Sequence, residues 1–540
     1  MEVLDSRWND KNLFVVEAPT GYGKSSITAS LALKTFRDNG KLIVVFPLRV
    51  LLEDQFTKLY ENIVKKNDDM LGKKYMHEPD SPYLIKPITL TTVDTLSLTM
   101  FGLAPEDLNK VIGNWDEWSG TTHKTMGHYL FSRSSILLSD IVLDEVHLLA
   151  DSTKSLTYLI ALIEYTIRNG QRIILMSATL SRYFKQIIEN SLDRYRSKIE
   201  WIEFDDKDRD FINERLNKKY NINVRELNPS NKFNTLLSWL EEGKANGFRK
   251  ALVVFNTVRD AIAFYKLVDD SNKLLLHSRF STVDKEEKQK ALARLRKNNS
   301  YVIVGTQSIE AGLDISSNLL ITELSPANSL IQRFGRFLRY DKEDEGTAYV
   351  WYEDTLNEKG RYKVYDAELC KRTLNFIKEN TEKLNLHIPC GENGYRSLID
   401  KTYEGELNQV NRHDVDEMLR PFLEFEDISK AVELFLQKEG SFVREGFNIP
   451  VITGDTHEEG VPISYSMFKK LLELGKVKGF VSEGLEKVQK ISQDDTRKLM
   501  KKSSAIRFLF RSNIKAFVIE GYYDSELGLV MEIGDEHEVA

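Results

Sequence analysis

A short glycine-containing stretch near the start of the chain, Ala18-Pro-Thr-Gly-Tyr-Gly-Lys-Ser25, constrains the fold more than any other feature. The apolar run Leu13–Val16 precedes it and predicts a buried strand, and residues Ser26–Phe36 predict a helix after it. A strand, a glycine turn and a helix start together form a cradle of backbone N–H groups that faces an anion. The stretch therefore predicts a phosphate-binding loop in an α/β domain.

The chemistry of this loop resides mainly in its last positions. Gly21 and Gly23 permit backbone angles that a side chain would block. Lys24 is placed to reach the β- and γ-phosphates, and the Ser25 hydroxyl to ligate Mg²⁺. The predicted nucleotide-binding residues of this stretch are Ala18, Pro19, Thr20, Gly21, Tyr22, Gly23, Lys24 and Ser25. Ala18 stands where the general phosphate-binding-loop pattern has glycine. The other characteristic positions of the pattern are present.

Composition limits the classes of protein to which the chain belongs. With 540 residues, we expect two to four domains, and 41% apolar residues suffice for packed cores. A net charge of −7 argues against binding of nucleic acid over the whole surface, but it allows a local basic groove. Two cysteines and no apolar run of membrane-spanning length favour a cytoplasmic protein without membrane partners.

Further buried strands alternate with helical stretches, which is typical of a parallel α/β sheet. They are predicted at Lys41–Phe46, Ile88–Asp94, Asp140–His147 and Arg172–Thr179. Hydroxyl and carboxylate side chains follow several of these strands, where a parallel sheet presents its ligands. Thr92 and Asp94 are examples.

Two adjacent acids, Asp144 and Glu145, follow one buried strand. Asp144 is placed to hold Mg²⁺, and Glu145 to orient and activate water. The alternative, that they only cap the next helix, is disfavoured because the phosphate-binding loop lies upstream in the same unit. Ser177 and Thr179 follow another strand and could connect the nucleotide site to a bound nucleic-acid strand.

A second α/β unit follows a charged connection. We expect the first unit at residues 1–200, the connection at 201–231, the second unit at 232–355 and an accessory region at 356–540. The accessory region is predicted to be mainly helical, with a β-hairpin within Lys515–Glu532. Leu330–Arg339 predicts a short arginine-rich helix, with Arg336 and Arg339 on one face. These arginines could neutralise phosphate charge from the facing unit.

In order along the chain, these segments resemble the motifs of superfamily-two DExD/H helicases. Residues Ala18–Ser25 resemble motif I, Pro47–Arg49 motif Ia, Thr91–Asp94 motif Ib and Asp144–His147 motif II, of DExH form. Ser177–Thr179 resembles motif III, Gly305–Asp314 motif V and Gln332–Arg339 motif VI. The resemblance implies two tandem RecA-like domains, ATP with Mg²⁺ as cofactors, and a nucleic-acid-stimulated ATPase, that is, a phosphoric anhydride hydrolase.

The same resemblance assigns expected roles to individual residues. It implies Glu145 as catalytic base, Gln332 near the γ-phosphate, and Arg336 and Arg339 as arginine fingers. The remaining positions are expected to bind the nucleotide (Gly312 and Asp314), to contact nucleic acid (Pro47, Arg49, Thr92, Asp94, Arg279, Thr306 and Gln307) and to couple the two sites (His147, Ser177 and Thr179).

Three further segments resemble the CRISPR-associated helicase–nuclease of type I interference: Gly127–Arg133, Leu276–Phe280 and Glu310–Ile315. That family usually carries an N-terminal HD nuclease domain, whereas motif I begins here at residue 18. The chain therefore resembles the split form, in which the HD nuclease is a separate subunit. The resemblance implies 3′ to 5′ movement on single-stranded DNA, antiviral defence, and a crRNA-guided surveillance complex as partner.

Two alternatives stay open on the sequence. A general DExH helicase for repair or RNA remodelling would share all the common motifs. A nucleic-acid-binding scaffold with an idle phosphate loop is disfavoured by the intact set of Lys24, Asp144, Glu145, Arg336 and Arg339.

Overall fold

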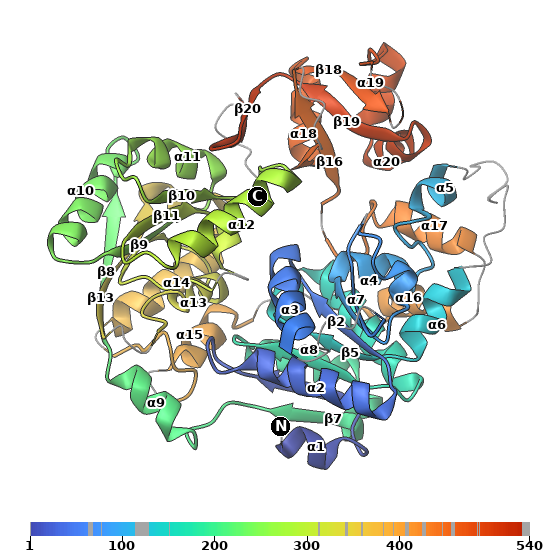
Figure 1. Cartoon of the computed structure of the whole chain (residues 1–540), viewed down its shortest axis with the longest axis horizontal. Helices are drawn as coiled ribbons and strands as arrows, with labels where there is room; N and C mark the ends of the chain where they lie inside the picture. Colours follow the sequence, from blue (N-terminus) through green and yellow to red (C-terminus); the bar gives the residue numbers. More distant parts are fainter. Residues whose placement is uncertain are drawn as a thin grey trace.

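Two parallel sheets and a C-terminal region make up the computed structural model of the chain (Figure 1). The structure describes residues 2–62, 69–76, 78–113, 129–150, 152–310, 314–340, 344–357, 360–381, 383–391, 394–405, 410–423, 428–444, 446–454, 460–482, 484 and 487–531. Gly312 and the first two residues of the Gly127–Arg133 segment lie outside these ranges.

The first sheet has seven parallel strands in the order β3-β4-β2-β5-β6-β1-β7. The five predicted strands form its centre, and their side chains are almost entirely buried because helices cover both faces (Figure 1). Its strands are β1 (Leu13–Glu17), β2 (Leu42–Phe46), β3 (Leu71–Lys74), β4 (Ile88–Thr92), β5 (Asp140–Leu143), β6 (Ile173–Ser177) and β7 (Ile199–Ile202). Its helices are α1 (Glu2–Arg7), α2 (Lys24–Asp38), α3 (Arg49–Asn62), α4 (Val93–Met100), α5 (Leu108–Gly113), α6 (Tyr129–Leu137), α7 (Thr153–Arg168) and α8 (Arg182–Ser191).

The second sheet has six parallel strands in the order β10-β11-β9-β12-β13-β8. Its strands are β8 (Lys219–Leu227), β9 (Lys250–Val254), β10 (Lys273–Leu276), β11 (Tyr301–Gly305), β12 (Leu319–Glu323) and β13 (Glu345–Glu353). Its helices are α10 (Lys232–Ala245), α11 (Val258–Leu267), α12 (Thr282–Leu295) and α13 (Ala327–Phe334). The predicted α/β fold with two parallel sheets is confirmed.

The chain crosses between the sheets through helix α9 (Arg209–Leu216). The predicted connection at 201–231 contains more structure than the sequence suggested. Its start includes the end of β7, and β8 pairs with β13 along nine residues as the edge strand of the second sheet.

Helices predominate in the C-terminal region, as expected, but a four-stranded mixed sheet of order β17-β16-β19-β18 was not foreseen. The expected hairpin is β20 with β21, shorter than the predicted segment because β19 belongs to the mixed sheet. The helices are α14 (Ala367–Asn380), α15 (Tyr395–Thr402), α16 (Arg412–Leu423), α17 (Ile428–Gln437), α18 (Tyr465–Glu473), α19 (Gln493–Leu499) and α20 (Lys502–Arg511). The strands are β14 (Arg361–Tyr362), β15 (Tyr365–Asp366), β16 (Asn448–Thr453), β17 (Val461–Ser464), β18 (Val477–Ser482), β19 (Ile514–Ile519), β20 (Tyr522–Asp524) and β21 (Gly528–Val530).

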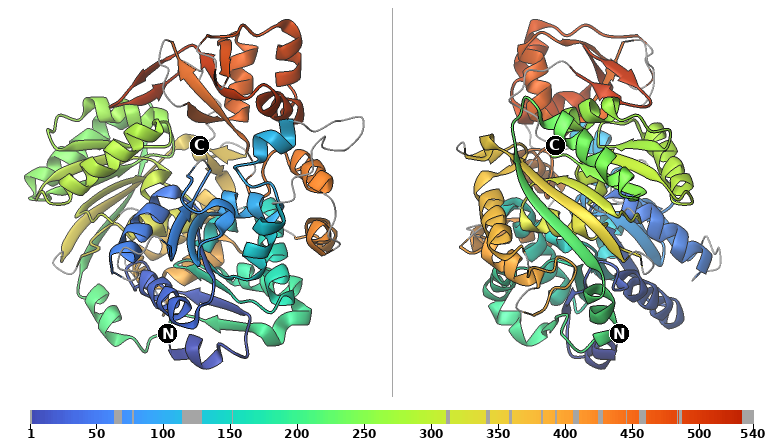
Figure 2. Two further views of the ribbon diagram at one scale, coloured as in Figure 1. Left: turned by 45° about the vertical axis from the view of Figure 1, so that its right-hand side comes forward. Right: turned by 90° about the vertical axis from the view of Figure 1, so that its left-hand side faces the viewer.

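The C-terminal sheet lies over both α/β units (Figure 2). Its apolar core is continuous with that of the first unit, and the rings of Phe101 and Phe442 stack with centroids 3.8 Å apart. The β20–β21 hairpin reaches the second unit through the Leu529 N–H, which donates to the Arg279 carbonyl at 2.8 Å, and through Leu527 and Val530, which pack against that unit's apolar core. The C-terminal region therefore contacts both units.

Candidate nucleotide and nucleic-acid sites

The predicted motifs of the first unit gather at one edge of its sheet. Because neighbouring strands are parallel, their carboxyl ends lie at the same edge. The phosphate-binding loop follows β1, Pro47 follows β2, Thr92 ends β4, Asp144 follows β5 and Ser177 ends β6.

The phosphate-binding loop has the backbone conformation that its glycines predict. Gly21 has φ of 86° and Gly23 has φ of 97°, both in the left-handed region that side chains disfavour. Helix α2 begins directly afterwards at Lys24. The Ser26 N–H donates to the Gly23 carbonyl at 2.8 Å, and the positive end of the helix dipole at this helix start favours a bound anion.

Lys24 and the acids of motif II lie together. Lys24 Nζ donates to Glu145 Oε1 at 2.8 Å, and the two side chains are only 11% and 13% exposed. Ser25 Oγ accepts a hydrogen bond from Gln55 Nε2 at 2.9 Å. Asp144 Oδ1 accepts from the Glu145 N–H at 2.9 Å.

The two adjacent carboxyl groups differ in their electrostatics. Burial, together with the neighbouring Glu145 charge, raises the pKa of Asp144 to about 7. Burial also acts to raise the pKa of Glu145, but the Lys24 cation and His147 outweigh it, so this pKa is lowered. Glu145 is therefore the group of the pair that stays ionised most readily.

The three predicted coupling residues meet in the structure. His147 Nδ1 lies 2.9 Å from Ser177 Oγ, within hydrogen-bond distance. Ser177 Oγ in turn accepts from the Thr179 N–H at 3.0 Å. Burial lowers the pKa of His147 to about 4, so its ring is neutral near pH 7. These contacts link motifs II and III.

The prediction that Arg336 and Arg339 share a helix face is wrong. Helix α13 ends at Phe334, Gly335 caps it, and Phe337 then forms an isolated bridge with Ser317, which pulls the chain away from the helix axis. Arg336 Nη2 donates to the Glu310 carbonyl at 3.1 Å, and Arg339 lies 3.5 Å from the predicted nucleotide-binding residue Asp314.

Several buried polar atoms around these residues lack hydrogen-bond partners within the described part of the chain. They are Glu145 Oε2, Thr179 Oγ1, Gln332 Nε2 and Arg336 Nε. Buried polar atoms are rarely left without partners, so these atoms fit a site that a polar ligand completes. Burial and the nearby Arg339 cation lower the pKa of Arg336 to about 9, which leaves it charged near pH 7. We call Lys24, Ser25, Asp144, Glu145, Gln332 and Arg336 the nucleotide edge.

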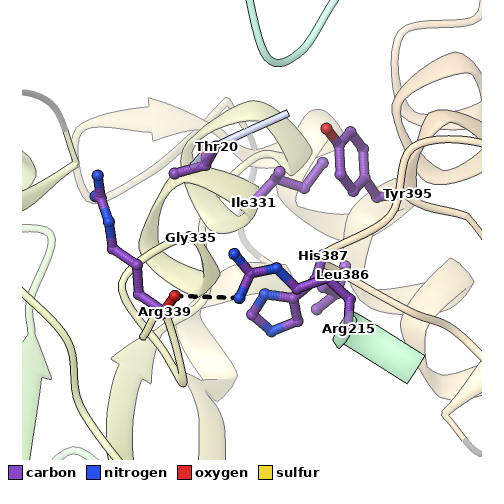
Figure 3. A pocket seen from close by; sticks show the side chains of 8 residues that line it. All are labelled: Thr20, Arg215, Ile331, Gly335, Arg339, Leu386, His387 and Tyr395. Carbon is purple, nitrogen blue, oxygen red and sulfur yellow. Dashed lines mark hydrogen bonds between the residues drawn. The ribbon is translucent and has the colours of Figure 1, made fainter. Parts of the chain in front are cut away.

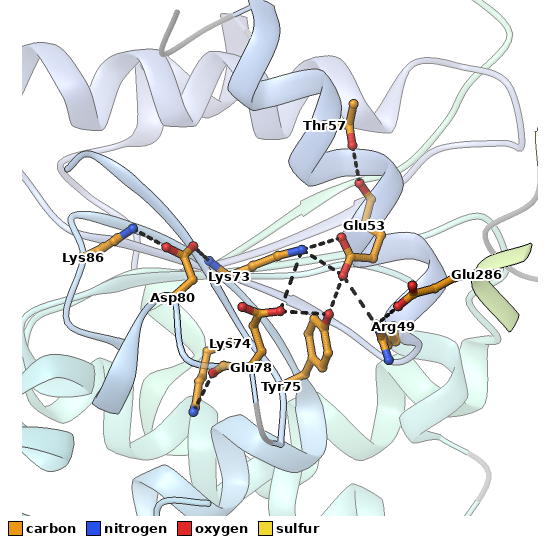
Figure 4. Close-up of polar contacts among 10 residues, drawn as sticks. All are labelled: Arg49, Glu53, Thr57, Lys73, Lys74, Tyr75, Glu78, Asp80, Lys86 and Glu286. Carbon is orange, nitrogen blue, oxygen red and sulfur yellow. Dashed lines mark hydrogen bonds and ion pairs between the residues drawn. The ribbon is translucent and has the colours of Figure 1, made fainter. Parts of the chain in front are cut away.

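Arg49, predicted to contact nucleic acid, forms an ion pair across the two units (Figure 4). Its Nη2 lies 2.9 Å from Glu286 Oε1 of α12, and its guanidinium carbon lies 4.4 Å from the centroid of the Tyr75 ring. The Tyr75 hydroxyl donates to Glu53 at 2.6 Å, and Lys73 pairs with the same carboxylate. Arg49 therefore sits in a network that includes the facing unit.

Asp94 is engaged by the C-terminal region. Arg444 donates to both Asp94 carboxylate oxygens at 2.7 to 2.9 Å and to the Pro47 carbonyl at 3.2 Å. Thr92 caps helix α4 by accepting from the Thr95 N–H. The Asp94 carboxylate is thus paired with the Arg444 guanidinium. The sequence did not indicate Arg444 as a site residue.

On the second sheet, Arg279 and Thr306 follow β10 and β11 and are 8% and 3% exposed. Gln307 Nε2 donates to the Asn256 carbonyl at 3.3 Å. We call Pro47, Arg49, Thr92, Asp94, Arg279, Thr306 and Gln307 the nucleic-acid edge.

Helix α15 contributes residues to the nucleotide region that no local pattern indicated. The Arg396 guanidinium pairs with Glu17 at the end of β1, and the Tyr395 hydroxyl donates to the Ala178 carbonyl at 2.9 Å. Gln55 on α3 was also missed. Their partners lie far away in the sequence, so spacing gave no signal for them.

No three His, Cys, Asp or Glu side chains of the described residues are grouped so that they could hold a metal ion. Among the same residues, every helix is too short or too polar to span a bilayer.

Both units match known protein families. Residues 2–187 match the family model of DEAD/DEAH box helicases, and residues 248–342 match that of the C-terminal part of the CRISPR-associated nuclease/helicase Cas3. The chain is thus similar to Cas3 helicases. A Methanocaldococcus jannaschii protein named as a CRISPR-associated nuclease/helicase Cas3 is 29% identical over 409 residues, which cover 69% of this chain and 50% of the relative.

Two further matches extend this Cas3-like assignment. The CRISPR-associated helicase Cas3 of Thermoproteus tenax is 25% identical over 63% of this chain and 56% of its own length. The chain thus spans about half the length of these curated relatives. The crystal structure of T. fusca Cas3 with AMPPNP superposes with a TM-score of 0.54 at 15% identity, covering 83% of this chain and 58% of that one, which supports two RecA-like domains.

Proposed function

We propose that the chain is an ATP-dependent motor that moves 3′ to 5′ on single-stranded DNA in CRISPR interference. The observation that carries the proposal is the nucleotide edge, where Lys24 and Glu145 meet at 2.8 Å beside Arg336 of the opposite unit. Phosphoryl transfer depends on positioning and charge neutralisation, and two facing units supply both.

The residues of the nucleotide edge suit Mg·ATP. Ser25 and Asp144 would hold Mg²⁺, which supplies charge neutralisation on the phosphates when bound. Glu145, kept ionised by its surroundings, would accept a proton from the attacking water. Lys24 would exchange its contact with Glu145 for the phosphates, and Arg336 would stabilise the charge that develops.

The proposed CRISPR role rests on sequence similarity. One similar protein is named a nuclease/helicase and another a helicase. We propose that this chain works with a separate HD-type nuclease subunit and with a crRNA-guided surveillance complex, in the cytoplasm. Support for a separate nuclease comes from the relative that is named without one.

Steady-state ATP hydrolysis with and without single-stranded DNA tests the motor. We expect stimulation by the DNA, and loss of nearly all turnover in Lys24→Ala because the phosphates lose their cation. Stimulation by RNA alone would instead favour an RNA-remodelling helicase. Equal turnover in the Lys24→Ala protein would contradict the proposed site.

Incubation with circular single-stranded DNA in Mg²⁺, Mn²⁺ or Ni²⁺ tests the separate nuclease. The chain alone should leave the circle intact, and cutting should require an added HD-type nuclease. Cutting that persists in Lys24→Ala but is lost in a His413 variant would place a nuclease in the C-terminal region.

A further inference from the structure

Arg215, near the end of α9, lies between the two units although it belongs to neither sheet. Its side chain is buried, and it lines a cleft of about 280 Å³, open mouth included, together with Thr20 and Arg339 (Figure 3). Thr20 belongs to the phosphate-binding loop and Arg339 is the last residue of motif VI. The connection between the units thus places a cation at the junction of their nucleotide motifs.

One side of the Arg215 guanidinium holds the backbone at the end of motif VI. Nη1 donates to the Arg339 carbonyl at 3.1 Å and to the Leu338 carbonyl at 3.4 Å. Lys218 contacts the same segment, donating to the carbonyls of Leu338 at 2.9 Å and Tyr340 at 2.8 Å. We call residues 335–340 the finger loop.

The other side of the guanidinium faces the phosphate-binding loop. A Cβ atom built on Gly21 would lie 3.2 Å from Arg215 Nη2, which places this nitrogen against the loop backbone. Glu214 Oε1 lies on the opposite nitrogen, 3.3 Å from Nη1. Nη2 is therefore the end that a phosphate on the loop would attract.

The finger loop also touches the phosphate-binding loop directly. A Cβ atom on Gly335 would lie 2.9 Å from the Thr20 side chain, so the two loops are in close contact. A small displacement of one loop therefore shifts the other, because closely packed interfaces do not deform freely.

We propose that Arg215 is a positioning residue that links occupancy of the phosphate-binding loop to the placement of Arg339. This inference rests on the proposed ATPase function. A phosphate bound at the loop draws Nη2 towards it. Because the guanidinium is a rigid planar fork, Nη1 carries the Arg339 backbone in the same direction. The contact acts through Arg339, and Arg215 itself need not touch the reacting atoms.

A double-mutant cycle of ATP turnover tests this route. We expect Arg215→Ala to lower kcat about tenfold with little change in KM, because misplacing a catalytic group slows the reaction more than it weakens binding. The Arg215→Ala/Arg339→Ala protein should be no slower than Arg339→Ala alone. Multiplied effects of the two substitutions would overturn the inference.

Lys218→Ala is the matched control, because Lys218 holds the same loop through the carbonyls of Leu338 and Tyr340, whereas the side chain beside Gly21 is that of Arg215. Hydrogen exchange of residues 335–340, with and without Mg·ADP, provides a readout that needs no turnover. Mg·ADP should protect the finger loop in wild type and Lys218→Ala, but not in Arg215→Ala. Equal protection in all three proteins would overturn the inference.

The two readouts separate this inference from the proposed function. A wild-type protein without ATP turnover, whose finger loop is protected in an Arg215-dependent manner, would refute the motor and uphold the link. If Arg215→Ala fails to fold, Arg215→Lys replaces it, because lysine keeps the charge but cannot contact both loops at once. Full protection in Arg215→Lys would then count against the inference.

Discussion

The nucleotide edge and the nucleic-acid edge occupy neighbouring parts of the same structure but are held in different ways. At the nucleotide edge, buried polar atoms of Glu145, Gln332 and Arg336 have no hydrogen-bond partner within the described residues, although Glu145 Oε2 lies 3.4 Å from His147 Nδ1. At the nucleic-acid edge, Arg49 and Asp94 are already in ion pairs with other parts of the chain. The first edge offers a ligand buried polar atoms without hydrogen-bond partners, although Lys24 must release Glu145, whereas at the second edge Arg49 and Asp94 must both exchange ion pairs for a ligand.

Arginines of motif VI repeat this contrast within a few residues. Arg333 is fully buried, and its guanidinium donates to Glu310, Thr322, Asn256 and neighbouring groups. Arg336 retains a buried Nε without a partner among the described residues. We infer that Arg333 stabilises the second unit, and that Arg336 serves the ligand.

The largest expected effect separates these two arginines. Arg336→Ala should lower kcat by about 10³, as arginine fingers do, while the melting temperature stays close to that of wild type. Arg333→Ala should instead destabilise the fold by about 3–5 kcal/mol, because it leaves the buried Glu310 carboxylate without its arginine. ATPase assays and thermal melts of both variants measure the change in kcat and in stability. Wild-type turnover in Arg336→Ala would contradict a role of Arg336 at the ligand.

The next effect concerns pH and the docking of the β20–β21 hairpin at the nucleic-acid edge. His277 Nε2 lies 3.0 Å from the Leu527 carbonyl, and Nδ1 accepts from the Arg279 N–H at 3.1 Å, so the neutral ring fits this site. Burial, with the Arg279 cation adding to it, lowers the pKa of His277 from 6.5 to about 3.

The sign of the pH effect follows from this lowered pKa. Below pH 6.5, His277 binds a proton when the hairpin is detached from the second unit, but not when the hairpin is docked on it. Docking is therefore fully stable above pH 6.5 and weakens as the pH falls towards about 3. Between pH 7 and pH 5 we expect a loss of about 2 kcal/mol, or about 30-fold in the protection of the Leu529 amide. Hydrogen exchange, corrected for intrinsic rates, measures this. His277→Gln should show little such change, and parallel profiles of the two proteins would contradict the mechanism.

The smallest effect concerns the ion pair of Arg49 with Glu286, whose side chains are 36% and 53% exposed. Exposed pairs contribute about 0–1 kcal/mol, so Glu286→Gln should tighten binding of single-stranded DNA at most about fivefold by freeing Arg49. Arg49→Ala should weaken binding and reduce the salt dependence by about 0.7 in the logarithmic slope. Lys401→Ala, which changes an exposed lysine in α15, serves as the control in these salt titrations. An unchanged slope in Arg49→Ala would exclude a phosphate contact there.

Local sequence patterns predicted the parts of the fold that depend on neighbouring residues. The buried strand before the loop, Gly21 and Gly23 in left-handed conformations, and the acids after β5 all follow from short stretches. Parallel pairing then brings distant motifs to one edge without further information.

Features set by distant partners could not be predicted in this way. Strand β16 pairs in parallel with β19, more than sixty residues later, and the apolar run of β19 does not reveal this distant partner. The end of α13 at Gly335 depends on the bridge from Phe337 to Ser317. Arg215 and Arg444 matter because of contacts with other units, which spacing along the chain does not encode.

The most direct test of the account compares binding and hydrolysis of ATP in Glu145→Gln. Glutamine keeps the shape of the side chain but cannot accept a proton from water, so Mg·ATP should bind with an affinity close to that of wild type. Calorimetry measures the affinity, and single-turnover hydrolysis with single-stranded DNA should be slower by at least about 10². Hydrolysis near the wild-type rate in Glu145→Gln would contradict the assignment of the nucleotide edge.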